Sequence, residues 1–139
     1  MGALRLKAIN QALALALEER EVVGKAHPRP VEFADTGEAI IGFPSSIDFD
    51  LTFQRGADRA VIPIWIVAGL MDADATLDEL ERLLGDGQEA VKAALETGEH
   101  GGLDEVISAL TIGTGAVDQV LVEGGLRYAA ARFDAEVVT

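Results

Sequence analysis

The stretch "DFDLTFQRGADRAVIPIWI", which begins at Asp48, constrains the fold more than any other part of the sequence. In its first half, Phe49, Leu51 and Phe53 alternate with Asp48 and Asp50. Its second half, after a charged turn, is apolar at nearly every position. Period-two alternation is typical of a strand with one wet face, whereas a short continuous apolar run indicates a strand buried on both faces. The stretch therefore predicts an antiparallel hairpin with one half-wet strand and one dry strand.

Two further features of this predicted hairpin are its tip and a proline in its second strand. The predicted tip is Arg55-Gly56-Ala57-Asp58-Arg59, in which the glycine can adopt the positive φ that a tight turn requires. Pro63 falls inside the second strand and has no N–H to donate to a ladder hydrogen bond. We therefore expect an edge position or a bulge at this proline.

Hydrophobic periodicity assigns the rest of the chain. Leu6, Ile9, Leu13 and Leu17 repeat at helical spacing. The predicted elements are a helix over 3–20, an irregular loop segment over 21–38, strands over 39–43, 47–54 and 59–69, helices over 72–84 and 88–96, and strands over 106–112, 117–123 and 126–138. The glycines of Gly113-Thr114-Gly115 predict a turn that ends the strand before them. Strand runs separated by helices indicate an α+β fold, a mostly antiparallel sheet with helices packed on one face, in a single domain over 1–139.

The last predicted strand alternates as cleanly as the first half of the hairpin. Ala131, Phe133 and Ala135 are apolar, and they alternate with polar residues, which are Arg132, Asp134 and Glu136. This pattern predicts that one face of the strand packs on the core and that the other is wet or lies at an interface.

Composition excludes several classes of function. The net charge of −13 disfavours attraction to nucleic acids and to anionic lipid. The absence of cysteine excludes disulfides, thiolate catalysis and cysteine-based metal sites. The longest apolar run, over 61–71, is too short to span a membrane, so we expect none.

The sequence also lacks a recognisable catalytic motif, so we expect no catalytic, cofactor-binding or metal-binding residues and no enzyme activity. Asp48 and Asp50 project from one strand face, roughly 7 Å apart by strand rise. Paired carboxylates can perform acid–base chemistry, but they also suit an exposed face or a contact patch. A small hydrolase or ligand-binding domain that uses Asp48, Asp50 or His100 stays as an alternative.

Several motifs resemble one family. The stretch "PSSIDFDLTFQRGADRAVIPIWIVAG" resembles the central signature of tail terminator proteins from long-tailed actinobacterial phages. "TLDELERLLGDG", "AVKAALE" and the closing "VEGGLRYAAARFDAEVV" resemble the segments that follow it in that family, in the same order. The resemblance covers roughly residues 39–138. The segment 21–38 departs from the family pattern, and Ala130 stands where the family usually has glycine.

The resemblance implies a structural virion protein similar to the lambda-type terminator. Such α+β subunits form a hexameric ring that caps the tail tube, stops its polymerisation and joins the tail to the head connector. Phage DNA passes through the lumen without specific binding. The expected partners are identical copies, the tail tube protein and the head–tail connector protein. The expected location is the tail–neck junction of the virion, after assembly in the host cytoplasm.

Charged residues of the hairpin and the last strand are the candidate interface. They are Asp48, Asp50, Arg55, Asp58, Arg59 and Arg132. Arginine is the favoured interface cation, and salt bridges at a charged tip can specify partners. Another head–tail connector component, such as a stopper or neck protein, or a tube-like tail protein, is the alternative within the same class.

Overall fold

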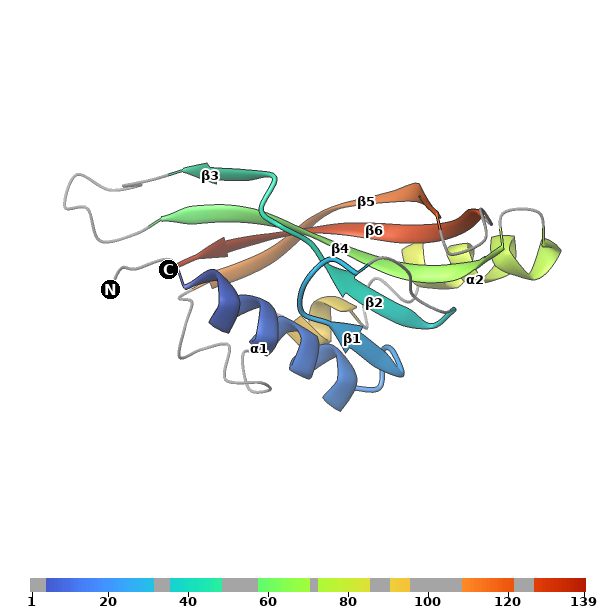
Figure 1. The fold of residues 1–139 in the computed structure, drawn as a ribbon, viewed down its shortest axis with the longest axis horizontal. Coiled ribbons are helices and arrows are strands. Elements are labelled where there is room, and N and C mark those ends of the chain that lie inside the picture. Colours follow the sequence, from blue (N-terminus) through green and yellow to red (C-terminus); the bar gives the residue numbers. More distant parts are fainter. Residues whose placement is uncertain are drawn as a thin grey trace.

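The fold of the computed structural model is α+β, and its mostly antiparallel sheet confirms the predicted fold class (Figure 1). The structure describes residues 5–31, 36–48, 58–70, 73–85, 91–95, 109–121 and 127–139. The elements are α1 (Leu6–Glu19), β1 (Lys25–His27), β2 (Glu38–Ile41), β3 (Ser46–Asp48), β4 (Arg59–Leu70), α2 (Asp74–Leu84), β5 (Ala109–Leu121) and β6 (Arg127–Val138), and residues 91–95 are also helical. No helix in these ranges is long and apolar enough to cross a membrane.

Three long strands form the body of the described sheet. Its order is β1-β2-β4-β6-β5, and β3 pairs with β4 beside β2. β4 pairs antiparallel with β6 from Arg59 opposite Val138 to Leu70 opposite Tyr128. β3 also pairs antiparallel with β4, as the predicted hairpin requires, although the tip of that hairpin lies outside the described residues.

The predicted turn at Gly113-Thr114-Gly115 is wrong. β5 runs unbroken through it and pairs with β6 along its whole length, with one irregularity between Ile112 and Thr114. The ladder to β6 supplies backbone hydrogen bonds on both sides of the glycines, and the irregularity absorbs one extra residue as a bulge does. Gly113 therefore marks a bulge rather than a strand end.

The segment 21–38 is also more regular than predicted. Lys25–His27 forms β1, which pairs in parallel with β2 and brings Ala26 opposite Ala39. His27, which falls in the segment predicted to be an irregular loop, is half-buried, and its Nε2 lies 2.8 Å from Oε1 of Glu38. Three residues carry too weak a pattern to be predicted as a strand, and parallel pairing depends on a neighbour that is distant in sequence.

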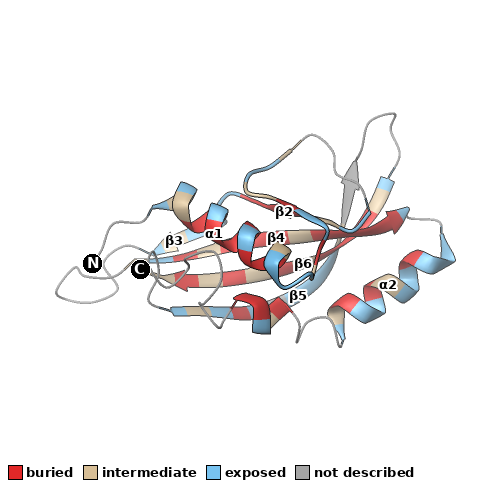
Figure 2. Cartoon of the chain, turned by 90° about the horizontal axis from the view of Figure 1, so that it is seen from below, coloured by how far each residue is buried: buried red, intermediate tan, exposed pale blue. Residues whose placement is uncertain are grey.

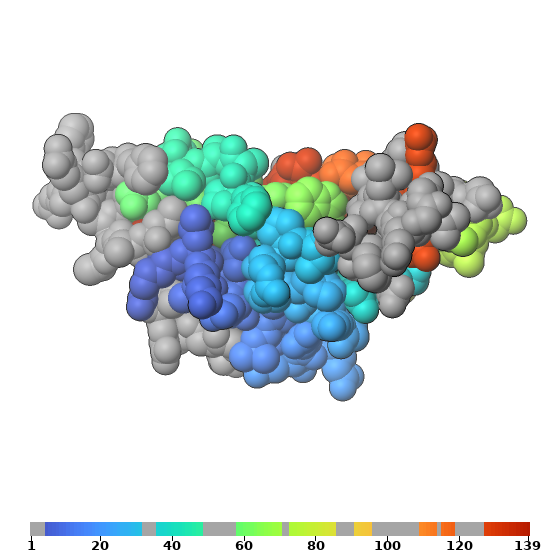
Figure 3. All heavy atoms as spheres, in the orientation of Figure 1, coloured from blue at the N-terminus to red at the C-terminus, as the bar shows by residue number. Residues whose placement is uncertain are grey.

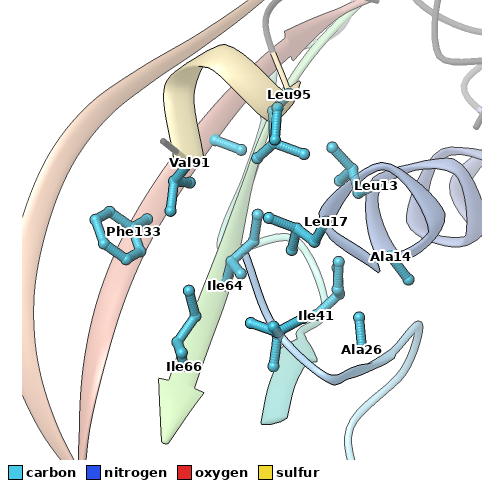
Figure 4. Close-up of a cluster of buried hydrophobic side chains, with 14 of the residues drawn as sticks. Leu13, Ala14, Leu17, Ala26, Ile41, Ile64, Ile66, Val91, Leu95 and Phe133 are labelled. Atoms are coloured by element: carbon cyan, nitrogen blue, oxygen red, sulfur yellow. The ribbon is translucent and has the colours of Figure 1, made fainter. Parts of the chain in front are cut away.

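One face of the sheet carries the core. Ile62, Ile64 and Phe133 are fully buried there, and α1, α2 and the helix over 91–95 contribute to the same cluster. Figure 2 shows α1 and α2 over the same side of the sheet, and Figure 4 shows Leu17 and Leu95 reaching toward Ile64 from two helices. The alternation predicted for β6 is confirmed, because Phe133 and Ala135 are buried whereas Arg132 and Asp134 are only half-buried. We call this helix-covered side the inner face and the opposite side the outer face.

Pro63 explains a break in the sheet. β2 pairs with β4 as far as Ile41 opposite Ile64, and β3 resumes at Ser46 opposite Val61. Four residues, 42–45, therefore stand against two, 62–63. The predicted edge position is wrong, since β4 lies between β2 and β6. The strand that carries the proline has no bulge there, since Pro63 stays in register opposite Asp134, and the irregularity lies instead in the partner, between β2 and β3.

A helix side chain replaces the hydrogen bond that Pro63 cannot make. Gly42 N–H donates to the Pro63 carbonyl at 2.9 Å, so the nitrogen of Pro63 also points toward Gly42. The Gly42 carbonyl instead accepts from Nδ2 of Asn10 at 3.3 Å. Asn10 belongs to α1 and is only 7% exposed. The bond therefore ties α1 to the sheet at the point where the ladder is interrupted.

Gly42 itself cannot easily be replaced. An added Cβ would lie 2.6 Å from the Trp65 ring and 3.0 Å from the Pro63 ring. These two side chains therefore pass directly over the Gly42 backbone on the outer face. The chain leaves β2 without a side chain to pack at this point, and the next residue, Phe43, is exposed.

Candidate interface on the outer face of the sheet

The outer face is built from the residues that alternate with the core. Arg59 and Trp65 of β4 lie on it, together with Arg132, Asp134 and Glu136 of β6. Because side chains along a strand point alternately to the two faces, β4 and β6 each supply one dry row and one wetter row. The wetter rows hold two clusters of charged side chains and one apolar patch.

The first cluster centres on Arg59 at the start of β4. Its Nη2 lies 2.6 Å from Oδ2 of Asp48 in β3, and its Nη1 lies 3.6 Å from Oε1 of Glu136 in β6. The hydrogen bond and the charge of Asp48, with a smaller contribution from Glu136, raise the pKa of the Arg59 guanidinium above its ordinary value. All three side chains are exposed over two-fifths or more of their area, so solvent screens their attraction.

The second cluster surrounds Trp65 near the middle of the sheet. The indole N–H donates to Oδ2 of Asp118 in β5 at 2.8 Å, and the guanidinium of Arg132 lies 5.8 Å from the centre of the indole ring. Arg132 also approaches Asp118 at 3.6 Å and Asp134 at 3.2 Å. A cation over an indole face is attracted by the ring quadrupole. The cluster therefore fixes Arg132 in one place while its charge remains partly accessible.

An apolar patch adjoins this second cluster. Ile40 of β2 and Val67 of β4 are buried on the outer face, and Val31, Trp65 and Tyr128 pack around them. Val31 belongs to the segment that follows β1. The outer face therefore passes from an apolar patch through the Trp65 cluster to the exposed Arg59 cluster.

The structure places four of the six candidate interface residues. Asp48 and Arg59 lie together, whereas Arg132 lies at the level of Trp65, six residues further along β4, about 20 Å away by strand rise. Asp58 extends the ladder between β4 and β6 by exchanging hydrogen bonds with Thr139. Asp50 and Arg55 lie outside the described residues, as does His100 of the alternative enzymatic hypothesis.

Four residues of these clusters were not among the candidates. Trp65, Asp118, Asp134 and Glu136 complete the two clusters. For Asp134 and Glu136 the signal was present, since they share the polar row of the last strand with Arg132. For Asp118 it was absent, because its contact with Trp65 spans 53 positions in the sequence and depends on strand order and register.

Outside this face, two hollows lie beside exposed apolar side chains. The first, of about 310 Å³, is a groove between α1, the segment after β1 and the link from β2 to β3, three segments that meet on the surface in Figure 3. The second, of about 300 Å³, lies where α2 meets β5 and β6. Within the described ranges, no three histidine, aspartate or glutamate side chains gather in a way that could hold a metal ion.

Comparison with known proteins assigns the chain to no family. No protein-family model and no curated protein matches the chain. The class that the structure defines is therefore an α+β protein whose mostly antiparallel sheet is covered by helices on one face and carries charged clusters on the other.

Proposed function

We propose that the protein is a non-enzymatic subunit of a phage tail terminator ring, which caps the tail tube and joins it to the head connector. The observation that carries the proposal is the one-sided burial of the sheet. The inner face is covered by helices, whereas the outer face presents Arg59 and Arg132 among carboxylates. A ring subunit needs such a division, since it must fold on one side and keep other surfaces for copies and partners.

The long strands also support this function. β5 contributes 13 residues and is the last strand of the described sheet on its side. A rigid sheet of three long strands can hold charged side chains at fixed spacings, which an end-to-end contact with a tube requires. The resemblance of residues 39–138 to tail terminators selects this role among those open to a one-sided sheet.

The negative charge of the outer face also suits the wall of a lumen through which DNA must pass. The two outer-face clusters together hold four carboxylates, Asp48, Asp118, Asp134 and Glu136, and two guanidiniums. The whole chain carries a net charge of −13. A wall of this sign repels phosphate, so DNA would slide past it without adhering.

Electron microscopy of particles made without this protein tests the proposal. A terminator that is missing leaves tails of uncontrolled, excessive length that do not join heads. The alternative, a connector stopper, leaves tailless filled heads that leak DNA. Tails of normal length joined to heads would overturn both. Addition of the purified chain to the overlong tails should cap them, and the capped ends should then bind heads.

Purified components provide a second measurement. Light scattering after size exclusion should show a closed oligomer of the chain, either alone at high concentration or after incubation with tail tubes. A chain that stays monomeric under both conditions and does not sediment with tubes would contradict the proposal.

A further inference from the structure

Among the described residues, the two most exposed large apolar side chains are those of Phe43 and Leu77. Phe43 is 72% exposed and Leu77 is 64% exposed. Val117, 52% exposed, lies beside Leu77 in the hollow where α2 meets β5 and β6. Exposed aromatic and aliphatic residues next to a hollow mark contact sites more often than isolated ones do.

The fold forces Phe43 outward. It stands in the link between β2 and β3, which departs from the β4 ladder opposite Pro63. It forms one wall of the groove lined by Leu6 of α1 and by Pro28 and Pro44. We call this surface the Phe43 face. Its two charged residues, Lys7 and Arg29, also line the groove and are both basic.

The surface around Leu77 has the opposite charge. Asp74, Leu77, Asp78 and Glu81 follow one another at positions i, i+3, i+4 and i+7 of α2, so they share one stripe of the helix, and all four are exposed. Within the described part of the chain, neither these carboxylates nor the Lys7 and Arg29 cations of the Phe43 face take part in an ion pair. We call the stripe, with the adjoining hollow, the Leu77 face.

The two faces complement each other in shape. The hollow of the Leu77 face measures about 300 Å³ and is lined by Leu77, Leu80 and Val117. A dry cavity of about 150 Å³ is known to hold a benzene ring, so this hollow has room for a phenylalanine side chain. Phe43 of a second copy would bury its ring there and bring the basic residues of its groove against the acidic stripe of α2.

The two faces lie in different parts of the elongated subunit. α2 stands at the right end in Figure 1, whereas α1 and the link between β2 and β3 lie in its centre and left half. One copy cannot bring its own faces together, and two copies that use one contact leave a Phe43 face and a Leu77 face free. Contacts of this head-to-tail kind propagate from copy to copy, and they form a ring when the rotation between neighbours closes.

We propose that the Phe43 face of one subunit binds the Leu77 face of the next, with Phe43 inserted into the hollow between α2 and β5. The closure of these contacts into a ring rests on the proposed function, whereas the pairing of the two faces does not. The charged outer face of the sheet takes no part in the contact and remains available to the tube, the connector or the lumen.

Site-directed cross-linking tests the pairing, because the chain has no cysteine of its own. Ser45→Cys places a thiol beside Phe43, and Ala73→Cys places one at the rim of the hollow; both positions are exposed, and neither removes an anchor. A short bismaleimide should join these two variants into 1:1 heterodimers. The double variant should give a ladder of higher species. Ala93→Cys, at an exposed alanine in the helix over 91–95, is the matched control and should not cross-link to Ser45→Cys.

Anchor substitutions complete the test. Phe43→Ser or Leu77→Asp should each lower the cross-linked yield about tenfold or more, as loss of a central interface anchor does. Leu15→Ser removes an exposed leucine of α1 outside both faces and should leave the yield unchanged. Circular dichroism should show the same fold for all three, since each position is exposed.

The outcomes separate this inference from the proposed function when tail tubes are included. If the chain binds tubes but Ser45→Cys and Ala73→Cys do not cross-link, only the pairing of faces is wrong. If they cross-link in solution but the chain does not bind tail tubes, the pairing of the two faces stands and the terminator role is wrong. Cross-linking of Ser45→Cys to itself, or a yield unaffected by Leu77→Asp, would also overturn the pairing.

Discussion

Phe133 and Arg132 are neighbours in β6, yet they belong to two faces of the sheet that are stabilised by different interactions. Phe133 is fully buried beneath the helices, where contact is dense and every lost methylene leaves a void. Arg132 lies on the outer face among Trp65, Asp118 and Asp134, where solvent screens its attractions. The inner face therefore supplies the stability, and the outer face can carry charges chosen for recognition.

Phe133→Ala should have the largest effect. Truncation of a fully buried phenylalanine in a core costs about 3–5 kcal/mol, from lost burial and from the cavity left behind. Denaturant titration should show a much lower midpoint with the slope unchanged. A loss below about 1 kcal/mol would mean that the helices collapse onto the gap, and that the inner face is less tightly packed than the buried cluster indicates.

Trp65→Phe should have an intermediate effect. The change keeps an aromatic ring on the outer face but removes the indole N–H that donates to Asp118. We expect a loss of about 1 kcal/mol in the free energy of unfolding, the usual net value of one hydrogen bond. A double-mutant cycle with Asp118→Ala isolates the bond. In a chain that already lacks the Asp118 carboxylate, Trp65→Phe should cause no further loss from this bond. Additive losses would show that the bond contributes nothing to stability.

Arg59→Gln should have the smallest effect, with no measurable change in the denaturant midpoint. The raised pKa of Arg59 means that its charge is stabilised in the folded chain, a contribution present at every pH below the arginine pKa of the unfolded chain. The change should therefore leave the pH dependence of stability unaltered between about pH 5 and 9. A loss as large as that of Trp65→Phe would contradict the division between the two faces. With stability unchanged, any loss of tube binding reports on contacts with other chains.

The sequence predicts what depends on local pattern. The alternation of Arg132, Phe133 and Asp134 assigned both faces of the last strand, and the leucine spacing of α1 placed its buried side. The outcome at Gly113 could not be foreseen, because glycines signal a turn unless a neighbouring strand holds them in a ladder. β1 was missed for a related reason, since three residues form a strand only against β2.

The outer-face clusters were half predictable. The sequence singled out Asp48, Arg59 and Arg132 by their charge and alternation. It could not show that Arg59 binds Asp48 within its own chain, or that Asp118 completes the Trp65 cluster, because both contacts follow from strand order and register. Asn10 is the clearest case. It is an amide on the apolar side of a helix, and its partner is the Gly42 carbonyl, which has no donor in the sheet because it faces Pro63. That proline lies 53 residues away, so nothing in the sequence around Asn10 indicates the bond.

The link over residues 42–45, opposite Pro63, has a consequence for the register of the sheet. Four residues stand against two, so the register slips by an even number, and Ile41 and Ile47 on either side of the break both turn toward the core. A link longer or shorter by one residue would invert every side chain of β3 and turn Ile47 toward water. The length of this link can therefore change only in steps of two, and the ladder does not dictate which side chain stands at position 43.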